Sequence, residues 1–170
     1  FNGQTKKTDT KLKILSIDIE CLPTDPKKPL DPKNNTIIMI SMAFTPSYKN
    51  KSSIVLLAKH ATINDTKSFH SEKDMLQEFC SILDSYDPDI ITGYNINAFD
   101  MPYILERLKK HNIPQTIGRA HDKNAFTRTM GIIQYSTVTG RIIADPYQIL
   151  KRDPWVKLHR YDLKTVSKEL

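Results

Sequence analysis

The sequence predicts an α/β domain built on a mixed five-stranded sheet with helices packed against it. Three apolar segments rich in Leu and Ile come first, at 12–20, 36–44 and 53–58. Segments with helical periodicity then alternate with two further apolar runs, at 89–94 and 140–145. Consecutive strands followed by alternating helices and strands are typical of a mixed sheet covered by helices.

The connections between the first three strands indicate how these strands pair. Residues 22–35 hold four prolines and two asparagines, a composition typical of a loop. None of the connections among the three strands contains a helical pattern, and short connections favour antiparallel pairing. We therefore expect these three strands to form an antiparallel meander.

Two helices are predicted with defined ends. Ser71 is a suitable N-cap with Asp74 three residues later, and one apolar face follows, made of Met75, Leu76, Phe79, Cys80 and Leu83. The pair Asp87-Pro88 is expected to end this helix. The second helix carries apolar residues at i, i+3, i+4 and i+7, namely Met101, Ile104, Leu105 and Leu108. Its last turn is basic and Pro114 lies beyond it.

The N-terminal residues and the C-terminal third of the chain give weaker patterns. Residues 1–11 are polar and lysine-rich and read as a lead-in to one domain spanning 12–170. Thr127 to Gly140 alternates around Gly131, which indicates a β-hairpin. Pro146 is expected to start a short helix, and Asp162 to cap a last one that carries Leu163, Val166 and Leu170.

Composition sets limits on the class of protein. The 170 residues are 39% hydrophobic and 26% charged, as in a soluble globular domain. Lys and Arg outnumber Asp and Glu by 25 to 19, giving a net charge of +6. A basic balance suits a protein that binds a polyanion such as nucleic acid. Charge alone, however, favours the simpler interpretation of a lysine-rich solvated surface.

Several classes of site and location are not indicated. Cys21 and Cys80 form no C-x-x-C pair, and no H-E-x-x-H spacing occurs, so we expect neither a zinc site nor a disulfide framework. No apolar run approaches the length of a membrane span, and no signal peptide is visible. A reducing interior suits such a chain.

Two carboxylates stand in the first predicted strand. Asp18 and Glu20 are two residues apart, so they share one face of the strand with their Cα atoms roughly 7 Å apart, while Ile17 and Ile19 face the core. Neighbouring carboxylates repel, and a divalent cation such as Mg²⁺ offsets that repulsion. Taken alone, the pair is better explained by a strand end that emerges into solvent.

A third acid follows the fourth predicted strand, in the stretch G-Y-N-I-N-A-F-D-M-P-Y. Taken alone, Asp100 reads as the N-cap of a helix that has Pro102 in its first turn. Asn95 could simply shape the turn and Phe99 simply pack. No one of these positions identifies a function by itself.

The positions together form a recognisable pattern. D-I-E in the first strand, then Y-N-x3-F-D-x-P-Y about 75 residues later, resembles the first two exonuclease motifs of family B DNA polymerases. The stretches G-R-I-I-A-D-P-Y and Y-D-L-K-T-V-S-K-E-L resemble the segment between that family's second and third motifs. The resemblance implies a ribonuclease-H-like fold and a 3′→5′ proofreading exonuclease.

The resemblance also implies roles for individual residues. Asp18 would bridge two Mg²⁺ or Mn²⁺ ions, Glu20 would hold the first ion, and Asp100 would hold the second. Asn95 and Phe99 would contact the single-stranded 3′ end, and Leu22 would wedge against its terminal base, unless Leu22 only closes the strand end. The partners implied are single-stranded and primer-template DNA and the remaining polymerase domains of the same chain.

One part of the family pattern is missing. The third motif, Tyr-x3-Asp, supplies a fourth carboxylate, yet none of the seven tyrosines is followed by Asp at the fourth position. We therefore expect that the chain stops before this motif and that the 170 residues alone are weakly active or inactive.

Two other functions remain open at this stage. One is a free-standing ribonuclease-H-like nuclease, and the other is an inactive scaffold that binds nucleic acid. Abundant Lys, Asn and Ile indicate an AT-rich genome, and an archaeal source is our expectation. The protein would then work in the cytoplasm at the nucleoid, or in the nucleus if its source is eukaryotic.

Overall fold

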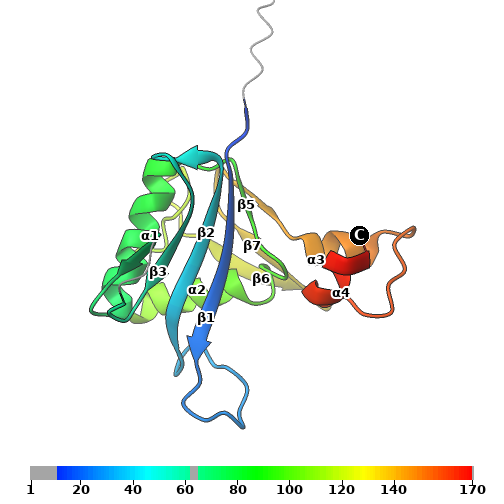
Figure 1. The fold of residues 1–170 in the computed structure, drawn as a ribbon, viewed down its shortest axis with the longest axis horizontal. Helices are drawn as coiled ribbons and strands as arrows, with labels where there is room; N and C mark the ends of the chain where they lie inside the picture. Colours follow the sequence, from blue (N-terminus) through cyan, green and yellow to red (C-terminus); the bar gives the residue numbers. More distant parts are fainter. Residues whose placement is uncertain (1–10, 62–64, 170) are drawn as a thin grey trace, which may run out of the picture.

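One mixed sheet organises the chain (Figure 1). The computed structural model describes residues 11–61 and 65–169, so the predicted lead-in lies outside the described residues apart from Lys11. The strand order is β4-β3-β2-β1-β5-β8, and β6 and β7 form a separate two-stranded sheet. The strands of the main sheet are β1 (Ile14–Leu22), β2 (Thr36–Tyr48), β3 (Lys51–Leu57), β4 (Thr66–Ser68), β5 (Ile90–Thr92) and β8 (Ile142–Ala144).

Strand β1 lies inside the sheet and confirms the predicted alternation. Leu15, Ile17 and Ile19 are buried, whereas Asp18 and Glu20 are exposed on the opposite face. The strand pairs antiparallel with β2 along its length, and β2 pairs antiparallel with β3, as the predicted meander requires. On its other side β1 pairs parallel with β5 over three residues only, opposite Ile90–Thr92.

The prediction of five strands was wrong, because the sheet has a sixth. Strand β4 is the three residues Thr66–Ser68, which pair parallel with β3 at the edge of the sheet. Backbone hydrogen bonds attach it, for example from Val55 N to the Asp65 carbonyl at 3.0 Å and from Phe69 N to the Leu57 carbonyl at 2.8 Å. A polar T-K-S segment has no apolar periodicity, so the sequence pattern gave no sign of it.

Helices α1 (Glu72–Tyr86) and α2 (Asp100–Lys110) provide the apolar layer that buries the sheet. The N-cap prediction for α1 is confirmed, since Ser71 Oγ accepts a hydrogen bond from Asp74 N at 3.2 Å. The helix ends at Asp87, which has a left-handed φ of 53° and precedes Pro88. The predicted apolar residues of both helices are buried, except Cys80, which is half-buried. The buried ones are Met75, Leu76, Phe79, Leu83, Met101, Ile104, Leu105 and Leu108.

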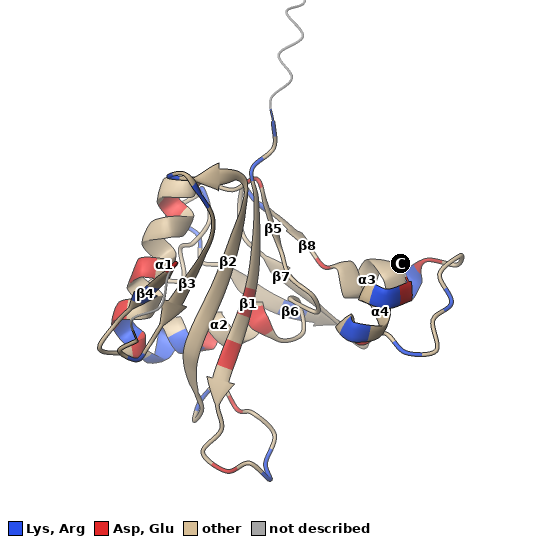
Figure 2. Cartoon of the chain, in the orientation of Figure 1, with Lys and Arg blue, Asp and Glu red and all other residues tan. Residues whose placement is uncertain are grey.

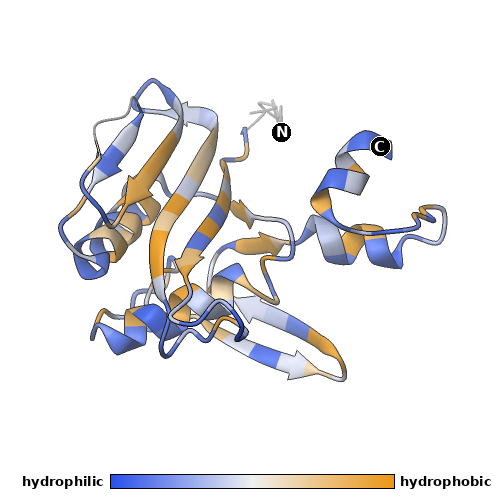
Figure 3. Cartoon of the chain, turned by 60° about the horizontal axis from the view of Figure 1, so that its bottom comes forward, coloured by the Kyte–Doolittle hydropathy of each residue, from blue (hydrophilic) through white to orange (hydrophobic). Residues whose placement is uncertain are grey.

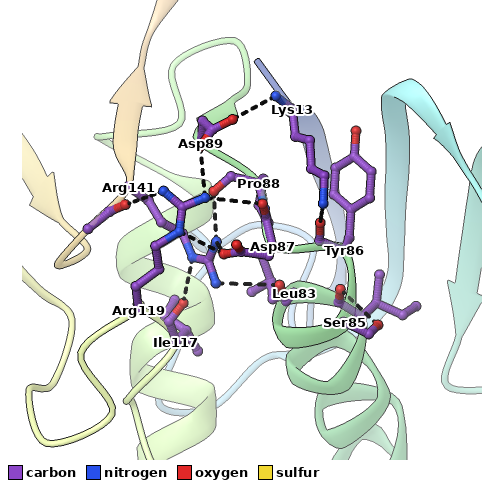
Figure 4. Close-up of polar contacts among 12 residues, drawn as sticks. Lys13, Leu83, Ser85, Tyr86, Asp87, Pro88, Asp89, Ile117, Arg119 and Arg141 are labelled. Atoms are coloured by element: carbon purple, nitrogen blue, oxygen red, sulfur yellow. Dashed lines mark hydrogen bonds and ion pairs between the residues drawn. The ribbon is translucent and has the colours of Figure 1, made fainter. Parts of the chain in front are cut away.

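A cluster of ion pairs joins the C-terminal end of α1 to the start of β1, β5 and β8 (Figure 4). Arg141 Nη1 lies 2.7 Å from Asp87 Oδ1, and Arg119 Nη2 lies 2.8 Å from Asp89 Oδ1. Asp89 Oδ2 also accepts from Lys13 N at 2.8 Å. Hydrogen bonding from Arg119 lowers the pKa of Asp87. These contacts fix the strand ends from which β1 and β5 run toward the acidic residues.

The C-terminal third carries the hairpin and two short helices. Strands β6 (Phe126–Met130) and β7 (Ile133–Thr137) confirm the predicted hairpin, with Gly131 at φ 64° in its turn. Its hydrophobic tip points away from the sheet (Figure 3). Helices α3 (Pro146–Arg152) and α4 (Leu163–Glu169) begin where predicted and stand apart from the sheet (Figure 1). None of the helices described is long and apolar enough to cross a membrane.

Candidate active site

The candidate site lies beside the C-terminal part of β1, beyond the point where its pairing with the parallel strand β5 ends. Strand β5 ends at Thr92, opposite Ser16, so it does not pair with the C-terminal part of β1. Asp100, the first residue of α2, lies against that part instead. Its Oδ1 accepts a hydrogen bond from Ile19 N at 3.2 Å, in the peptide that directly follows Asp18. The second acidic motif therefore meets the first at this edge of β1.

Gly93 allows the chain to approach β1 this closely. A Cβ atom at position 93 would lie 2.6 Å from the carbonyl oxygen of Ile17 and 3.2 Å from Ile96 Cβ. Neither neighbour can yield easily, because one is strand backbone and the other is a fully buried side chain. Only glycine fits at the start of the turn that leads to Asp100.

Asp100 does not adopt the capping role that its sequence position suggested. The N-cap of α2 is Phe99, with no side-chain capping bond, and Asp100 is only 2% exposed. Burial first, and then the charge of Asp18, raise the pKa of Asp100 to about 6. The carboxylates of Asp18 and Asp100 are therefore electrostatic neighbours, which disfavours the negative charge on the buried one.

Glu20 lies on the same exposed face of β1 as Asp18, and both acidic positions fall in the C-terminal half of the strand (Figure 2). Among residues 11–61 and 65–169, no three His, Cys, Asp or Glu side chains are grouped closely enough to hold a metal ion. The structure thus brings together Asp18 and Asp100, but not all three predicted acids. Mg²⁺ needs only one or two carboxylates besides waters and substrate phosphates, so this pair suits such an ion.

The predicted substrate-contacting residues lie close in sequence to the acids. Asn95 has φ 64° and lies in the turn between β5 and α2. Phe99 is half-buried, and its ring centroid lies 5.5 Å from that of Tyr103. Leu22 ends β1 and remains 57% exposed. All three are placed near the acids along the chain, and their contact with a substrate stays a prediction.

A cavity of about 580 Å³ adjoins the same turn. It is lined by the turn, the hairpin and α3, namely Asn95, Ala98, Thr129, Ile132, Ile133, Gln134, Tyr147, Gln148, Lys151 and Arg152. Lys151 Nζ lies 3.0 Å from the hydroxyl of Tyr147, and Arg152 Nη2 lies 2.8 Å from that of Tyr135. Neither cation forms an ion pair with a carboxylate in the described part of the chain. The cavity wall is therefore positively charged and partly aromatic.

Two residues of this region were missed by sequence reasoning. Asp145 is 4% exposed and accepts hydrogen bonds from the backbone of both Asn95 and Asn97. Asn97 is also buried, and its Oδ1 accepts from Ser136 N at 2.7 Å. An acid directly before Pro146 could have been recognised as a helix cap, but its link to a turn about 50 residues away leaves no local pattern.

The raised pKa of Asp100 leads to a prediction about stability. Asp100→Asn keeps an oxygen for Ile19 N but removes the disfavoured charge, so the metal-free chain should gain about 1–3 kcal/mol at pH 8. The wild-type chain bears the full free-energy cost of burying the Asp100 charge above pH 6, so the gain of the variant is largest there. The gain disappears as the pH falls to about 4, where Asp100 is protonated in the unfolded chain as well. Thermal unfolding in EDTA at pH 8 and at pH 4 measures the gain. A lower melting temperature for the variant at pH 8 would contradict it.

Comparison with known proteins gives a consistent result. A model of the family described as "DNA polymerase family B, exonuclease domain" matches residues 2–166. The DNA polymerase delta catalytic subunit of Plasmodium falciparum is 35% identical over 94% of this chain, and the DNA polymerase of Pyrococcus glycovorans is 30% identical over 93% of it. This chain spans only 16% and 19% of the lengths of those two relatives.

A solved structure agrees with the sequence relatives. The family B DNA polymerase of the hyperthermophilic archaeon Pyrobaculum calidifontis matches 85% of this chain and 17% of its own, with TM-score 0.65 and 25% identity. The relatives are eukaryotic, archaeal and viral, so they do not single out the archaeal source that we expected. The mixed sheet is that of the expected ribonuclease-H-like fold, and the chain belongs to the exonuclease domain of the family B DNA polymerases.

Proposed function

We propose that this domain hydrolyses the 3′-terminal phosphodiester of single-stranded DNA and thereby proofreads for a DNA polymerase. The observation that carries the proposal is the buried carboxylate of Asp100, held against β1 beside Asp18. Each acid lies in a sequence pattern that resembles a motif of the exonuclease family, and the matched range 2–166 includes both acids. A buried acid with a raised pKa beside a second acid is typical of a functional site.

The proposed chemistry assigns distinct tasks to the acids. Two bound Mg²⁺ or Mn²⁺ ions would supply an activated water and stabilise both the attacking and the leaving oxygen. Asp18, Glu20 and Asp100 would hold them. Asp100 is the most constrained of the three, because its Oδ1 already accepts from Ile19 N. Asp18 and Glu20 are exposed on the face of β1 from which DNA can approach.

DNA would reach the acids along the turn that contains Asn95 and Phe99. The neighbouring cavity presents Lys151 and Arg152, which lack carboxylate partners in the described region, together with the ring of Tyr147. Cations of this kind attract phosphates, and aromatic rings stack on any base. Leu22 would contact the terminal base. Such a site tolerates any sequence, as proofreading requires.

The rest of the molecule follows from the same proposal. Because the chain spans under a fifth of its relatives' lengths, its partners would be primer-template DNA and further polymerase domains of one longer protein. That protein would work in the nucleus of a eukaryote or at the nucleoid of an archaeon. The alternatives, a free-standing nuclease and an inactive scaffold, are outcomes of the test below.

The test is degradation of a single-stranded oligonucleotide by the full-length protein that contains this domain. With millimolar Mg²⁺ or Mn²⁺ we expect nucleotides to be released stepwise from the 3′ end, and with EDTA we expect none. The 170 residues alone should be much slower, because none of their tyrosines begins a Tyr-x3-Asp motif and the fourth carboxylate of the family pattern is missing. Binding without metal-dependent degradation would identify a scaffold instead, and degradation without nucleotide incorporation would identify a free-standing nuclease.

A further inference from the structure

Asp145 is the most heavily hydrogen-bonded buried carboxylate near the site. It lies between β8 and α3 and is 4% exposed. Its Oδ1 accepts from Asn95 N at 3.0 Å and from Tyr147 N at 3.1 Å, and its Oδ2 accepts from Asn97 N at 3.1 Å. Gln148 N contributes a longer contact of 3.4 Å to Oδ1. Backbone N–H groups therefore converge on one ionisable side chain.

These donors belong to two different segments. Tyr147 and Gln148 lie in the first turn of α3, where an aspartate N-cap normally satisfies such donors. Asn95 and Asn97 lie in the turn between β5 and α2, about 50 residues earlier in the chain. Capping of α3 does not require the hydrogen bonds from Asn95 N and Asn97 N. Asp145 is therefore both the cap of α3 and a tie between α3 and the turn.

The turn needs such a tie because its backbone is constrained. Asn95 has φ 64°, a conformation that a non-glycine residue adopts at some cost. Four residues after Gly93, which lies against the carbonyl of Ile17, the chain must also present Asn97 Oδ1 to Ser136 N of β7. Hydrogen bonds to a charged, buried acceptor are stronger than those to a neutral one. Asp145 is the acceptor of such hydrogen bonds from the backbone of the turn.

The turn ends at the acid that the proposed function requires. Asp100 follows Asn97 by three residues, and Ile96 O accepts from Met101 N at 3.0 Å, so the turn runs directly into the start of α2. A shift of the turn would move the Asp100 carboxylate away from Ile19 N and from Asp18. Groups that orient metal-holding residues usually affect metal affinity and activity by about 10–100-fold.

We propose that Asp145 is a positioning residue for the exonuclease site: it holds the Asn95–Asn97 turn so that Asp100 faces Asp18. The inference rests on the proposed function. Asp145 touches neither substrate nor metal in this assignment. It acts through the backbone of the turn, and its charge is also one of those that raise the pKa of Asp100.

The decisive variant is Asp145→Ser in the full-length protein. Serine can still cap α3, but its single, shorter oxygen cannot also reach Asn95 N and Asn97 N. We expect kcat for single-stranded DNA to fall about 10–100-fold and the half-saturating Mn²⁺ concentration to rise by a similar factor. The KM for DNA should change less than about threefold, because the DNA-facing side chains remain. Asp145→Asn, which keeps one carbonyl oxygen at full reach, should give intermediate values.

A matched control separates positioning from general destabilisation. Ser71→Ala removes the cap of α1, outside the turn, and should leave kcat and the Mn²⁺ dependence unchanged. The inference is overturned if Asp145→Ser matches wild type in kcat and Mn²⁺ dependence, or if high Mn²⁺ restores none of its lost rate. If Asp145→Ser does not fold, the same criteria apply to Asp145→Asn. A wild-type protein without metal-dependent degradation would instead refute the proposed function itself.

Discussion

Alanine in place of Asp18 is expected to abolish 3′→5′ degradation of single-stranded DNA by the full-length protein and to leave nucleotide incorporation nearly unchanged. Asp18 is the acid whose charge acts on buried Asp100, and it is the proposed bridge between the two ions. Losing that ligand would weaken the binding of ions whose charge would stabilise the leaving oxygen, so the rate should fall by about three orders of magnitude or more. Incorporation would use a separate metal site in another part of the protein.

The measurement is the release of nucleotides from a labelled oligonucleotide, beside primer extension by the same preparation. Asp122→Ala is a suitable control, because Asp122 is an exposed acid in a loop outside the site. That variant should match wild type in both assays. Equal degradation rates for wild type and Asp18→Ala would leave Asp18 a structural acid and refute its catalytic assignment.

The largest effect on stability is expected at Glu72. Glu72 and Arg107 form a buried ion pair in which Arg107 Nε donates to Glu72 Oε1 at 2.8 Å, and both residues are less than a tenth exposed. Burial alone would raise the pKa of Glu72, but hydrogen bonds from Arg107 and His111 outweigh it and lower the pKa. Glu72→Ala leaves the Arg107 charge buried and unpaired, which should cost about 3–5 kcal/mol of unfolding free energy.

Denaturant unfolding of the 170-residue chain measures this loss. Glu78→Ala is the matched control, since Glu78 pairs with Lys67 at 2.6 Å on the surface and its loss should cost less than about 1 kcal/mol. Replacing both Glu72 and Arg107 by leucine should recover much of the stability, because no unpaired charge then remains. An equal loss for Glu72→Ala and Glu78→Ala would show that burial does not determine the strength of these pairs.

Much of the fold could be predicted because its signals are local. Apolar alternation identified β1, and capping residues such as Ser71 and Asp162 located helix starts that the structure confirms. Strand β4 was not predicted, because its pairing with β3 depends on backbone groups, which any sequence supplies. A short edge strand of polar residues looks like a loop when only side-chain periodicity is considered.

The candidate site was predictable only where its residues form motifs. Asp18, Glu20 and Asp100 could be named from spacing, yet the capping interpretation of Asp100 could be dismissed only once Phe99 was found at the cap. Asp145 could not be assigned a role, since its partners Asn95 and Asn97 are backbone groups far away in the sequence. The identity of a side chain does not indicate which distant backbone groups it will contact in the folded chain.

The contact between Asp100 and Ile19 also bears on the solubility of the chain. An apolar strand with an unpaired edge is a template for adding a strand from another molecule, the first step of aggregation. Strand β1, of sequence I-L-S-I-D-I-E-C-L, would present such an edge where β5 ends. Asp100 accepts the hydrogen bond of Ile19 N there, so this N–H cannot pair with another strand. A carboxylate at that position also repels the carbonyl groups of an incoming strand. The Asp100 carboxylate beside the candidate site therefore also protects this edge of β1 from pairing with a strand of another molecule.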